Sequence, residues 1–315
     1  MNNESSPLGL LEAETILYIK LGQGGEFVKK CFTGNPHTMK LDYRTVPHAL
    51  CMDGDWSAVH EFLTKEGHSA STSTNHLRQI RSFYEEGEST VWVTFHDNKL
   101  WWCQAETEIT IDEQNIKSRR VKGEWSDENI AGEKLLFGNL SGELLTTKAY
   151  RGTICKVPSE YVLRKINNQL SGDAEEIKTL TAALQTKIAG LIQKLYWNDL
   201  ELFVDLVFRQ SGWRRVSYLG KQEKTIDLDL ESTVTGERGV VQVKARSTLE
   251  EFRAYEKELE GFRKDYQKVF YVCPRPEKGL QNLKSETGTV LYFSDKLAEL
   301  AISAGLVDWL IKKCG

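Results

Sequence analysis

Residues 225–246, TIDLDLESTVTGERGVVQVKAR, alternate apolar and polar side chains on both sides of a short segment that contains glycine. The alternation predicts two antiparallel strands joined by a turn at residues 235–239. Because successive side chains of a strand point to opposite faces, one face of this hairpin is apolar and carries Ile226, Leu228, Leu230, Val241, Val243 and Ala245. The opposite face carries carboxylates, an amide and basic groups, from Asp227, Asp229, Glu231, Gln242, Lys244 and Arg246.

This polar face has two interpretations. The first is an ordinary hairpin with one solvated face, which is common in antiparallel sheets. The second is a site for a divalent metal, because Mg²⁺ prefers one or two carboxylates together with water and phosphate oxygens. A nearby lysine can then orient or deprotonate the attacking water. The segments on either side of the hairpin decide between the two.

Helical and extended patterns alternate around the hairpin. Before it, apolar residues recur at helical spacing from Leu200 to Phe208, and Gly212 ends this helix ahead of a short strand at residues 214–219. After it, apolar residues at helical spacing predict a second helix from Phe252 to Tyr266, followed by a buried strand at residues 269–273. The predicted order is helix, three strands, helix, strand, which favours the metal site.

This order resembles the core of the PD-(D/E)xK nuclease superfamily, and within it the Mrr-like restriction endonucleases. The resemblance covers residues 200–273, with an added strand at residues 289–294. It rests on Glu201 in the first helix, on Asp227 after an isoleucine, and on Gln242 and Lys244 in the Q-x-K form of the third motif. It implies an α/β restriction-endonuclease-like domain over residues 196–315.

The same resemblance implies that Asp227, Gln242 and Glu201 bind Mg²⁺, and that Lys244 positions the attacking water. The chain departs from the family pattern in three ways. Residues 221–225 are charged where Mrr-like chains are often rich in glycine, and Gln242 stands in place of the more common acidic ligand. Asp229 lies on the same predicted face as Asp227 and could replace or assist it.

The N-terminal half contains a second predicted hairpin, TVWVTFHDNKLWWCQA at residues 90–105, with its turn at Asp97 and Asn98. Its strands are rich in aromatic residues. These rings could pack in the core, as most tryptophans do, or stack on a base that has been taken out of a DNA duplex. Both uses are compatible with one chain.

A basic run follows this hairpin, in the segment NIKSRRVKGEW, and consists of Lys117, Arg119, Arg120 and Lys122. Its two interpretations are a solvated loop and a loop that contacts phosphate. Further upstream, residues 15–21 predict a strand that leads into a glycine-rich turn at residues 22–25 and then a helix. Such a turn can present N–H groups to a phosphate, although tight backbone geometry alone also explains its glycines.

Further short strands at residues 37–44, 134–145 and 150–157, and helices at residues 56–66 and 75–84, suit a small β-barrel with flanking helices. Residues 1–160 resemble a PUA-like domain of the EVE type, on the run FYEEGESTVWVTFHDNKLWW and on the strand order. The resemblance implies an α+β domain that reads modified bases. Its base pocket would be lined from six side chains, those of Tyr43, Phe95, His96, Trp101, Trp102 and Trp125.

Residues 161–195 are expected to connect the two domains. Apolar residues recur there at helical spacing, at Ile177, Leu180, Leu184, Ile188, Leu191 and Leu195. This stripe could pack on either domain or on a second copy of itself. At the end of the chain, residues 295–313 predict helical cover for the nuclease sheet.

Composition sets limits on the classes of function. At 315 residues the chain is long enough for two domains, and its formal net charge of −4 argues against a surface that coats nucleic acid throughout. The six cysteines form no CxxC pair, which favours free thiols in a cytoplasmic protein over a zinc site. No apolar run approaches the roughly 20 residues that a membrane span needs.

Together, these features predict a Mg²⁺-dependent endonuclease that cuts double-stranded DNA where its N-terminal domain finds a modified base. Cutting both strands calls for two sites, and therefore for a homodimer. Two alternatives remain open. One is a DNA-binding or regulatory protein that keeps the nuclease fold without its chemistry, and the other is a nuclease controlled by a small molecule or a partner protein.

Overall fold

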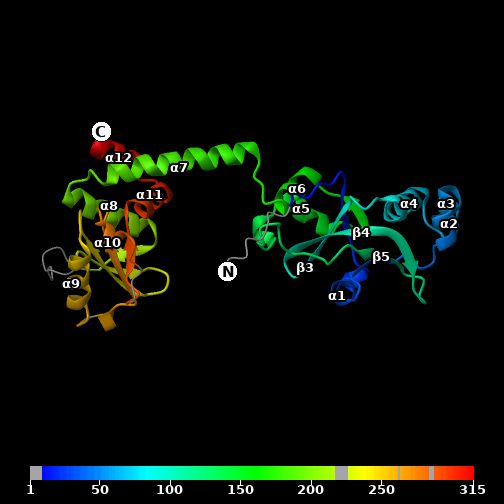
Figure 1. Ribbon diagram of the computed structural model, residues 1–315, viewed down its shortest axis with the longest axis horizontal. Helices are drawn as coiled ribbons and strands as arrows, with labels where there is room; N and C mark the ends of the chain where they lie inside the picture. Colours follow the sequence, from blue (N-terminus) through cyan, green and yellow to red (C-terminus); the bar gives the residue numbers. More distant parts are fainter. Residues whose placement is uncertain (1–8, 217–225, 262, 284–286) are drawn as a thin grey trace. The chain divides into compact units, whose positions relative to one another are not determined.

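The computed structural model describes residues 9–216, 226–261, 263–283 and 287–315. The chain forms two compact units that divide between Ser171 and Gly172 (Figure 1). The segment expected to connect the domains contributes to both units. Helix α6 (Ser159–Ile166) belongs to the first unit and the long helix α7 (Gly172–Ile192) to the second.

A six-stranded sheet forms the centre of the N-terminal unit. Its strands follow the order β2-β5-β4-β3-β1-β6, and all neighbours are antiparallel except β1 and β3. The strands are β1 (Ile16–Ile19), β2 (Thr38–Leu41), β3 (Val91–His96), β4 (Lys99–Ile111), β5 (Lys117–Val121) and β6 (Ile154–Lys156).

Strand β4 is long and bent, as Figure 1 shows. Its first half pairs with β3 and its second half with β5, and the register shifts between Ala105 and Ile109. Among the described residues no pairing joins the edge strands β2 and β6, so the sheet is curved but open. The predicted closed barrel is therefore not confirmed.

The predicted aromatic hairpin is confirmed as β3 and β4. Asp97 and Asn98 have φ angles of 50° and 55°, which matches the two-residue turn that suits the twist of a hairpin. Short polar side chains tolerate this left-handed backbone better than other residues do. The turn therefore fixes the register from Val91 opposite Gln104 to His96 opposite Lys99.

Helices cover the N-terminal sheet. Ser69 caps α4 by accepting a hydrogen bond from the Thr72 N–H, so this helix begins five residues earlier than the sequence predicts. Ile80 and Phe83 of α4 are buried, as predicted. The helices of this unit, besides α6, are α1 (Val28–Thr33), α2 (His48–Met52), α3 (Trp56–Lys65), α4 (Ala70–Glu85) and α5 (Gly142–Thr146).

The C-terminal unit is built around a five-stranded sheet with the order β11-β10-β9-β8-β7. The hairpin of β8 and β9 is antiparallel, whereas β9, β10 and β11 are parallel. Its strands are β7 (Trp213–Arg215), β8 (Leu228–Ser232), β9 (Arg238–Val243), β10 (Lys268–Val272) and β11 (Val290–Tyr292). The predicted order of helix, three strands, helix and strand is confirmed.

Two layers of helices enclose this sheet. The second half of α7 packs with α8, α11 and α12 on one face, and α9 and α10 pack on the other. A capping box between Thr248 and Glu251 starts α9. The further helices are α8 (Trp197–Gln210), α9 (Leu249–Leu259), α10 (Lys278–Gln281), α11 (Ser294–Ser303) and α12 (Val307–Cys314).

The central hairpin differs from its prediction in two details. Leu228 pairs with Val241 and both enter the core beside α8, as expected, but Ile226 precedes the strand and packs on the α9 side instead. The polar face is not fully solvated, because helix α9 covers part of it and leaves Gln242 only 2% exposed. Residues 221–225, which depart from the family pattern, lie outside the described residues.

The six cysteines are free thiols, and four of them, Cys31, Cys51, Cys103 and Cys273, are buried as expected. A search of the described part of the chain finds no helix with both the length and the apolar character needed to cross a membrane.

Candidate active site

The candidate active site begins at Asp227, the residue just before β8. The Asp227 N–H donates to the Val241 carbonyl oxygen at 3.1 Å, which ties the residue to the neighbouring strand. Its carboxylate oxygen Oδ2 accepts hydrogen bonds from Gln242 Nε2 at 2.5 Å and from the Val243 N–H at 2.6 Å. Asp227 is therefore held in one orientation by β9.

Gln242 and Lys244 extend from the same face of β9 and its continuation. Gln242 is buried, and its amide nitrogen is used by Asp227, which leaves its amide oxygen as a further acceptor. Lys244 follows the strand, and its N–H donates to the Val272 carbonyl oxygen at 2.9 Å. Its side chain is exposed, so a cationic head stands at the carboxyl end of the strand next to the buried pair.

Glu201 reaches this place from the second turn of α8. Burial raises the pKa of its carboxyl group, and the negative charge of Asp227 raises it further, while Arg215 and Lys244 act in the opposite direction. The structure thus brings Glu201, Asp227, Gln242 and Lys244 together, although they come from a helix and two strands.

Two further residues belong to this neighbourhood and were missed in the sequence. Arg215, on β7, donates from Nη2 to the Asp227 carbonyl oxygen at 3.2 Å. Tyr255, on α9, is buried, and burial followed by the charge of Asp227 raises its pKa. Its hydroxyl has no hydrogen-bond partner among the described residues. In the sequence, Arg215 could be noticed only as a basic residue at the end of the strand before the hairpin. Tyr255 could not be told apart from the other apolar positions of α9.

Asp229 does not share the place of Asp227. Arg238 binds its carboxylate with one guanidinium nitrogen, at 2.6 and 2.8 Å from the two oxygens. The guanidinium carbon of Arg238 also lies 5.1 Å from the centre of the Tyr266 ring. The Asp229 carboxylate is therefore neutralised by a neighbour, while Asp227 faces Glu201.

The donor atoms of this site suit Mg²⁺. Burial raises the pKa of Asp227, against the opposing effects of the Val243 N–H, Lys244, Arg215 and Gln242. Two partly buried carboxylates and an amide oxygen are hard ligands, and a divalent cation would offset the repulsion between the carboxylates. No group of three His, Cys, Asp or Glu residues suited to a metal occurs in the described chain, so water and phosphate would supply the remaining ligands.

The six side chains predicted to line one base pocket are divided between two core clusters and the surface. Trp101 and Trp125 pack on Phe32, with ring centres 4.4 and 5.3 Å away, and exposed His96 is 5.8 Å from the same ring. Phe95 and Trp102 face the opposite core. Tyr43 hydrogen-bonds to His76 Nδ1 at 2.7 Å. The six side chains do not line one common cavity among the described residues, and their contact with a base stays a prediction.

A cavity of about 350 Å³ lies beside the end of β3. It is lined by Phe95 and His96 of the predicted set, and also by Tyr18, Lys20, Leu21, Gly24, Gly25, Val28 and Thr94. The glycine-rich turn after β1 thus forms one wall, with φ angles of 64° at Gly24 and 82° at Gly25. The glycine-rich turn and the aromatic hairpin were treated as separate features of the sequence. It was not predicted that they line one cavity.

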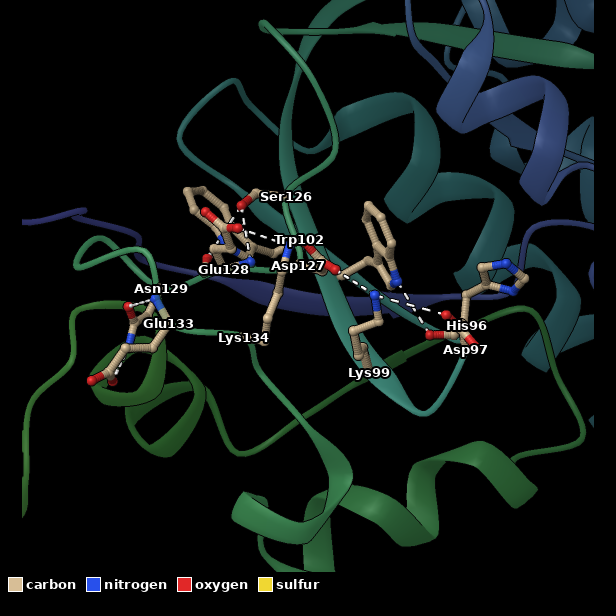
Figure 2. A network of polar contacts seen from close by, with 11 residues as sticks. His96, Asp97, Lys99, Trp102, Ser126, Asp127, Glu128, Asn129, Glu133 and Lys134 are labelled. Carbon is tan, nitrogen blue, oxygen red and sulfur yellow. Dashed lines mark hydrogen bonds and ion pairs between the residues drawn. The ribbon is translucent and has the colours of Figure 1, made fainter. Parts of the chain in front are cut away.

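A polar network surrounds the neighbouring turn of β3 and β4 (Figure 2). Nearly buried Asp127 accepts hydrogen bonds from Lys99 and Lys134, each at 2.7 Å, and Trp102 Nε1 donates to the Glu128 carbonyl oxygen at 2.8 Å. These hydrogen bonds hold residues 126–134 against β4. Trp102 therefore has a structural role, while His96 stands at the edge of this network.

The basic run at residues 117–122 is not a loop, because its first five residues form strand β5. Lys117 is buried and donates to the carbonyl oxygens of Tyr43 and Val46, at 2.5 and 2.8 Å. Arg119 is buried as well. The prediction of a phosphate-contacting loop is wrong for these two residues, because their charges point into the domain.

The other two members of the run are exposed but paired. Arg120 lies 3.7 Å from Glu106, and Lys122 lies 2.5 Å from Glu88. Surface ion pairs of this kind are weak, so these two cations remain candidates for a phosphate contact.

A search of solved structures matches the DNA modification-dependent restriction endonuclease AspBHI, with a TM-score of 0.30 and 10% sequence identity, over 71% of this chain and 68% of that chain. A TM-score of this size does not establish a common fold, so the function is inferred from the residues of the site. A scan against protein-family models and a search of curated proteins gave no match.

The melting temperature Tm should depend on both pH and Mg²⁺, because protons and Mg²⁺ would compete for the carboxylates of Asp227 and Glu201. The pKa values of Asp227 and Glu201 are both raised above their ordinary values of 3.8 and 4.5. Their protonated forms therefore stabilise the metal-free fold most at pH values below 3.8. This stabilisation is lost as the pH rises through the raised pKa values. Mg²⁺ would need both carboxylates in their ionised form. We therefore expect Mg²⁺ to raise Tm near neutral pH and to have little effect at pH values below the ordinary ones.

The control for this experiment is Asp227→Asn, in which the pair of carboxylates is lost. Its Tm should show no Mg²⁺ dependence at any pH. A Mg²⁺ shift of the same size in this variant, or one that persists in acid, would place the metal elsewhere.

Proposed function

We propose that this chain is a Mg²⁺-dependent DNA endonuclease that restricts phage or other foreign DNA carrying modified bases. The observation that supports the nuclease most strongly is the convergence of Glu201, Asp227, Gln242 and Lys244 at one edge of a mixed sheet. In the sequence, the same residues carry the resemblance to the PD-(D/E)xK motifs. The proposed substrate is double-stranded DNA, and the reaction is hydrolysis of a phosphodiester bond.

In this reaction, Asp227, Glu201 and the amide oxygen of Gln242 would hold Mg²⁺. The bound ion would supply charge neutralisation at the scissile phosphate and a lowered pKa for water. Lys244 orients the attacking water and stabilises the charge that develops on the phosphate oxygens. The water oxygen forms a bond to phosphorus and releases a proton to solvent as the bond to the opposite ester oxygen breaks, and the leaving oxygen takes up a proton from solvent.

A nicking assay tests the nuclease directly. Purified protein should convert supercoiled plasmid containing modified cytosines into nicked and linear forms in the presence of Mg²⁺, and EDTA should stop the conversion. If no conversion occurs over a wide range of Mg²⁺ and protein concentrations, the proposed activity is refuted.

We propose that the N-terminal unit is a PUA-like reader, and that the cavity beside β3 receives the modified base. Enzymes that inspect a base extrude it from the duplex and hold it by stacking and by hydrogen bonds. Phe95 and Tyr18 supply aromatic surface, Thr94 supplies a hydroxyl, and His96 stands exposed at the rim. These side chains support the assignment of the cavity as the base pocket.

Replacing His96 should therefore affect recognition more than stability. His96→Ala removes an exposed ring, so the fold should persist while the preference for modified over unmodified DNA falls about tenfold, the equivalent of one lost contact of roughly 1–3 kcal/mol. Competition binding with paired duplexes measures this ratio. His60→Ala, which replaces a histidine of α3 that does not line the cavity, is the matched control. An unchanged ratio in His96→Ala would remove His96 from the pocket.

We further propose that the enzyme acts as a homodimer through the first half of α7. Within the C-terminal unit, Ile177, Leu180 and Leu184 are 63%, 61% and 42% exposed, whereas the later part of the stripe is buried in the core. Acidic residues stand at the start of this helix and Lys187 stands further along it. An antiparallel second copy would bring these opposite charges together, which favours the second copy as the partner of this surface.

Leu180→Glu should disrupt such a dimer, because it places two carboxylates near the proposed twofold axis. We expect the variant to elute as a monomer in light-scattering chromatography at concentrations where the wild type is dimeric. Ala182→Glu adds the same charge on another face of the exposed helix and should leave the dimer intact. A wild type that is monomeric throughout would refute this interface.

A further inference from the structure

A cavity lies next to the candidate active site, at the carboxyl ends of the parallel strands. Two loops run side by side there, one after β9 and one after β10. Arg275 Nε donates to the Ala245 carbonyl oxygen at 3.2 Å, and the Glu277 N–H donates to the Ser247 carbonyl oxygen at 3.0 Å. Ala245 directly follows Lys244 in the chain. This hydrogen bond therefore holds the Arg275 guanidinium group beside the residue next to the proposed catalytic lysine.

The cavity has a volume of about 580 Å³, which is within the usual range for ligand pockets. It extends from Arg275 to the start of α11 and to Gln193, the residue just after α7. Its polar lining includes Gln193, Arg275, Asn282, Asp295 and Lys296, and the ring of Phe293 contributes apolar surface. The candidate catalytic residues do not line it, so it is a separate feature of the same edge.

The chemistry of this lining favours a phosphate group. Arg275 uses one guanidinium N–H for the Ala245 carbonyl, and a guanidinium has five such donors in a planar fork that fits phosphate. Lys296 adds a second cation, although it also pairs with Glu299 at 2.6 Å. Asp295 is the one carboxylate among the lining residues, and it is exposed to solvent. Of the two cations that line the cavity, Arg275 is therefore the one anchored beside the residue that follows Lys244.

We propose that this cavity binds a phosphate of the DNA strand adjacent to the scissile phosphate, with Arg275 as its main contact. This proposal rests on the proposed nuclease function, because the scissile phosphate defines the path of the strand. A strand with one phosphate at Asp227 and Lys244 would reach Arg275 by following the carboxyl edge of the sheet, because Arg275 is anchored on Ala245. A free nucleotide carries the same phosphate chemistry, so the test separates the two sources.

The test measures DNA binding in EDTA, where cleavage cannot occur, with the full-length protein and a labelled duplex at several salt concentrations. Each phosphate contact contributes a slope of about −0.9 to the dependence of log K on log salt. Arg275→Gln should reduce the magnitude of the slope by about that amount and weaken binding about tenfold at low salt. Lys312→Gln, which removes an exposed cation of α12 outside the cavity, should change neither quantity.

A second arm adds deoxycytidine monophosphate and follows Tm. If the nucleotide raises the Tm of the wild type but not of Arg275→Gln, while the salt slope for DNA is unchanged, the ligand is a free nucleotide and the DNA assignment is overturned. Equal salt slopes with no nucleotide effect would overturn the phosphate site altogether. Because DNA binding is measured without Mg²⁺, it does not depend on cleavage. A protein that fails to cleave DNA would count against the proposed nuclease, but the binding data would still test the phosphate site. The Tm of each variant in buffer confirms that it is folded.

Discussion

Asp227→Asn should reduce DNA cleavage by about 10³-fold while leaving DNA binding largely intact. The substitution keeps the shape of the side chain but removes the charge that faces Glu201 and that Mg²⁺ would need. The amide oxygen of the asparagine can still accept from Gln242 and the Val243 N–H, so the variant keeps these hydrogen bonds and loses the charge. Cleavage rates and filter binding on the same DNA separate the two effects.

Asp229→Asn is a closely matched control, since it lies two residues further along the same strand and makes the same chemical change. Asp229 pairs with Arg238 at 2.6 Å and stands apart from the catalytic cluster, so its loss should change the cleavage rate less than about threefold. If both variants lost activity equally, Asp227 would have no special role. If neither did, the nuclease site would lie elsewhere.

Arg119→Ala should destabilise the N-terminal unit by about 3–5 kcal/mol. Arg119 is completely buried and donates to the carbonyl oxygens of Glu106, Phe83 and Ala105, at 2.6, 3.2 and 3.4 Å. Its guanidinium carbon also lies 5.8 Å from the centre of the Trp92 ring. Truncation would leave three carbonyl groups without this donor and open a cavity in the core.

Calorimetry of the full chain can detect this loss, because a two-unit protein can unfold in separate transitions. The transition of the N-terminal unit should fall by roughly 6–20 °C, and that of the C-terminal unit should not move. Arg120→Ala, the next residue on β5, removes an exposed arginine and should shift stability by less than about 0.5 kcal/mol. Equal effects of the two variants would mean that Arg119 is not a structural residue.

The C-terminal half of the fold was predictable because its signals are local and repetitive. Strict alternation on both sides of a glycine-bearing turn specifies a hairpin and its register, and the register alone places Gln242 and Lys244 on one face. Helical spacing from Leu200 onward then brings Glu201 close to the same edge. Arg215 and Tyr255 could not be assigned in this way, because their approach to Asp227 depends on how β7 and α9 pack.

The N-terminal half was less predictable because its polar residues have partners far away in the sequence. Lys117 donates to main-chain oxygens more than 70 residues earlier, and nothing in the run KSRRV distinguishes a buried lysine from a solvated one. The aromatic hairpin carried a similar ambiguity. Its rings alternate between two cores, and the cavity that contains Phe95 and His96 is completed by β1 and its glycine turn.

The proposed base pocket lies in the N-terminal unit, and the proposed catalytic site lies in the C-terminal unit. Substitutions in one unit should therefore alter selectivity and substitutions in the other should alter the rate, which makes the two halves separable by experiment.

One measurement tests the central claim most directly: Mg²⁺-dependent cleavage of two versions of one phage DNA, carrying ordinary or modified cytosines, by the wild type and by Lys244→Ala. We expect the wild type to cut only the modified DNA, and Lys244→Ala to lose this activity by at least about 100-fold. Equal cutting of both DNAs would refute the reader while keeping the nuclease. Failure of the wild type to cut either DNA, or full activity in Lys244→Ala, would contradict the catalytic assignment itself.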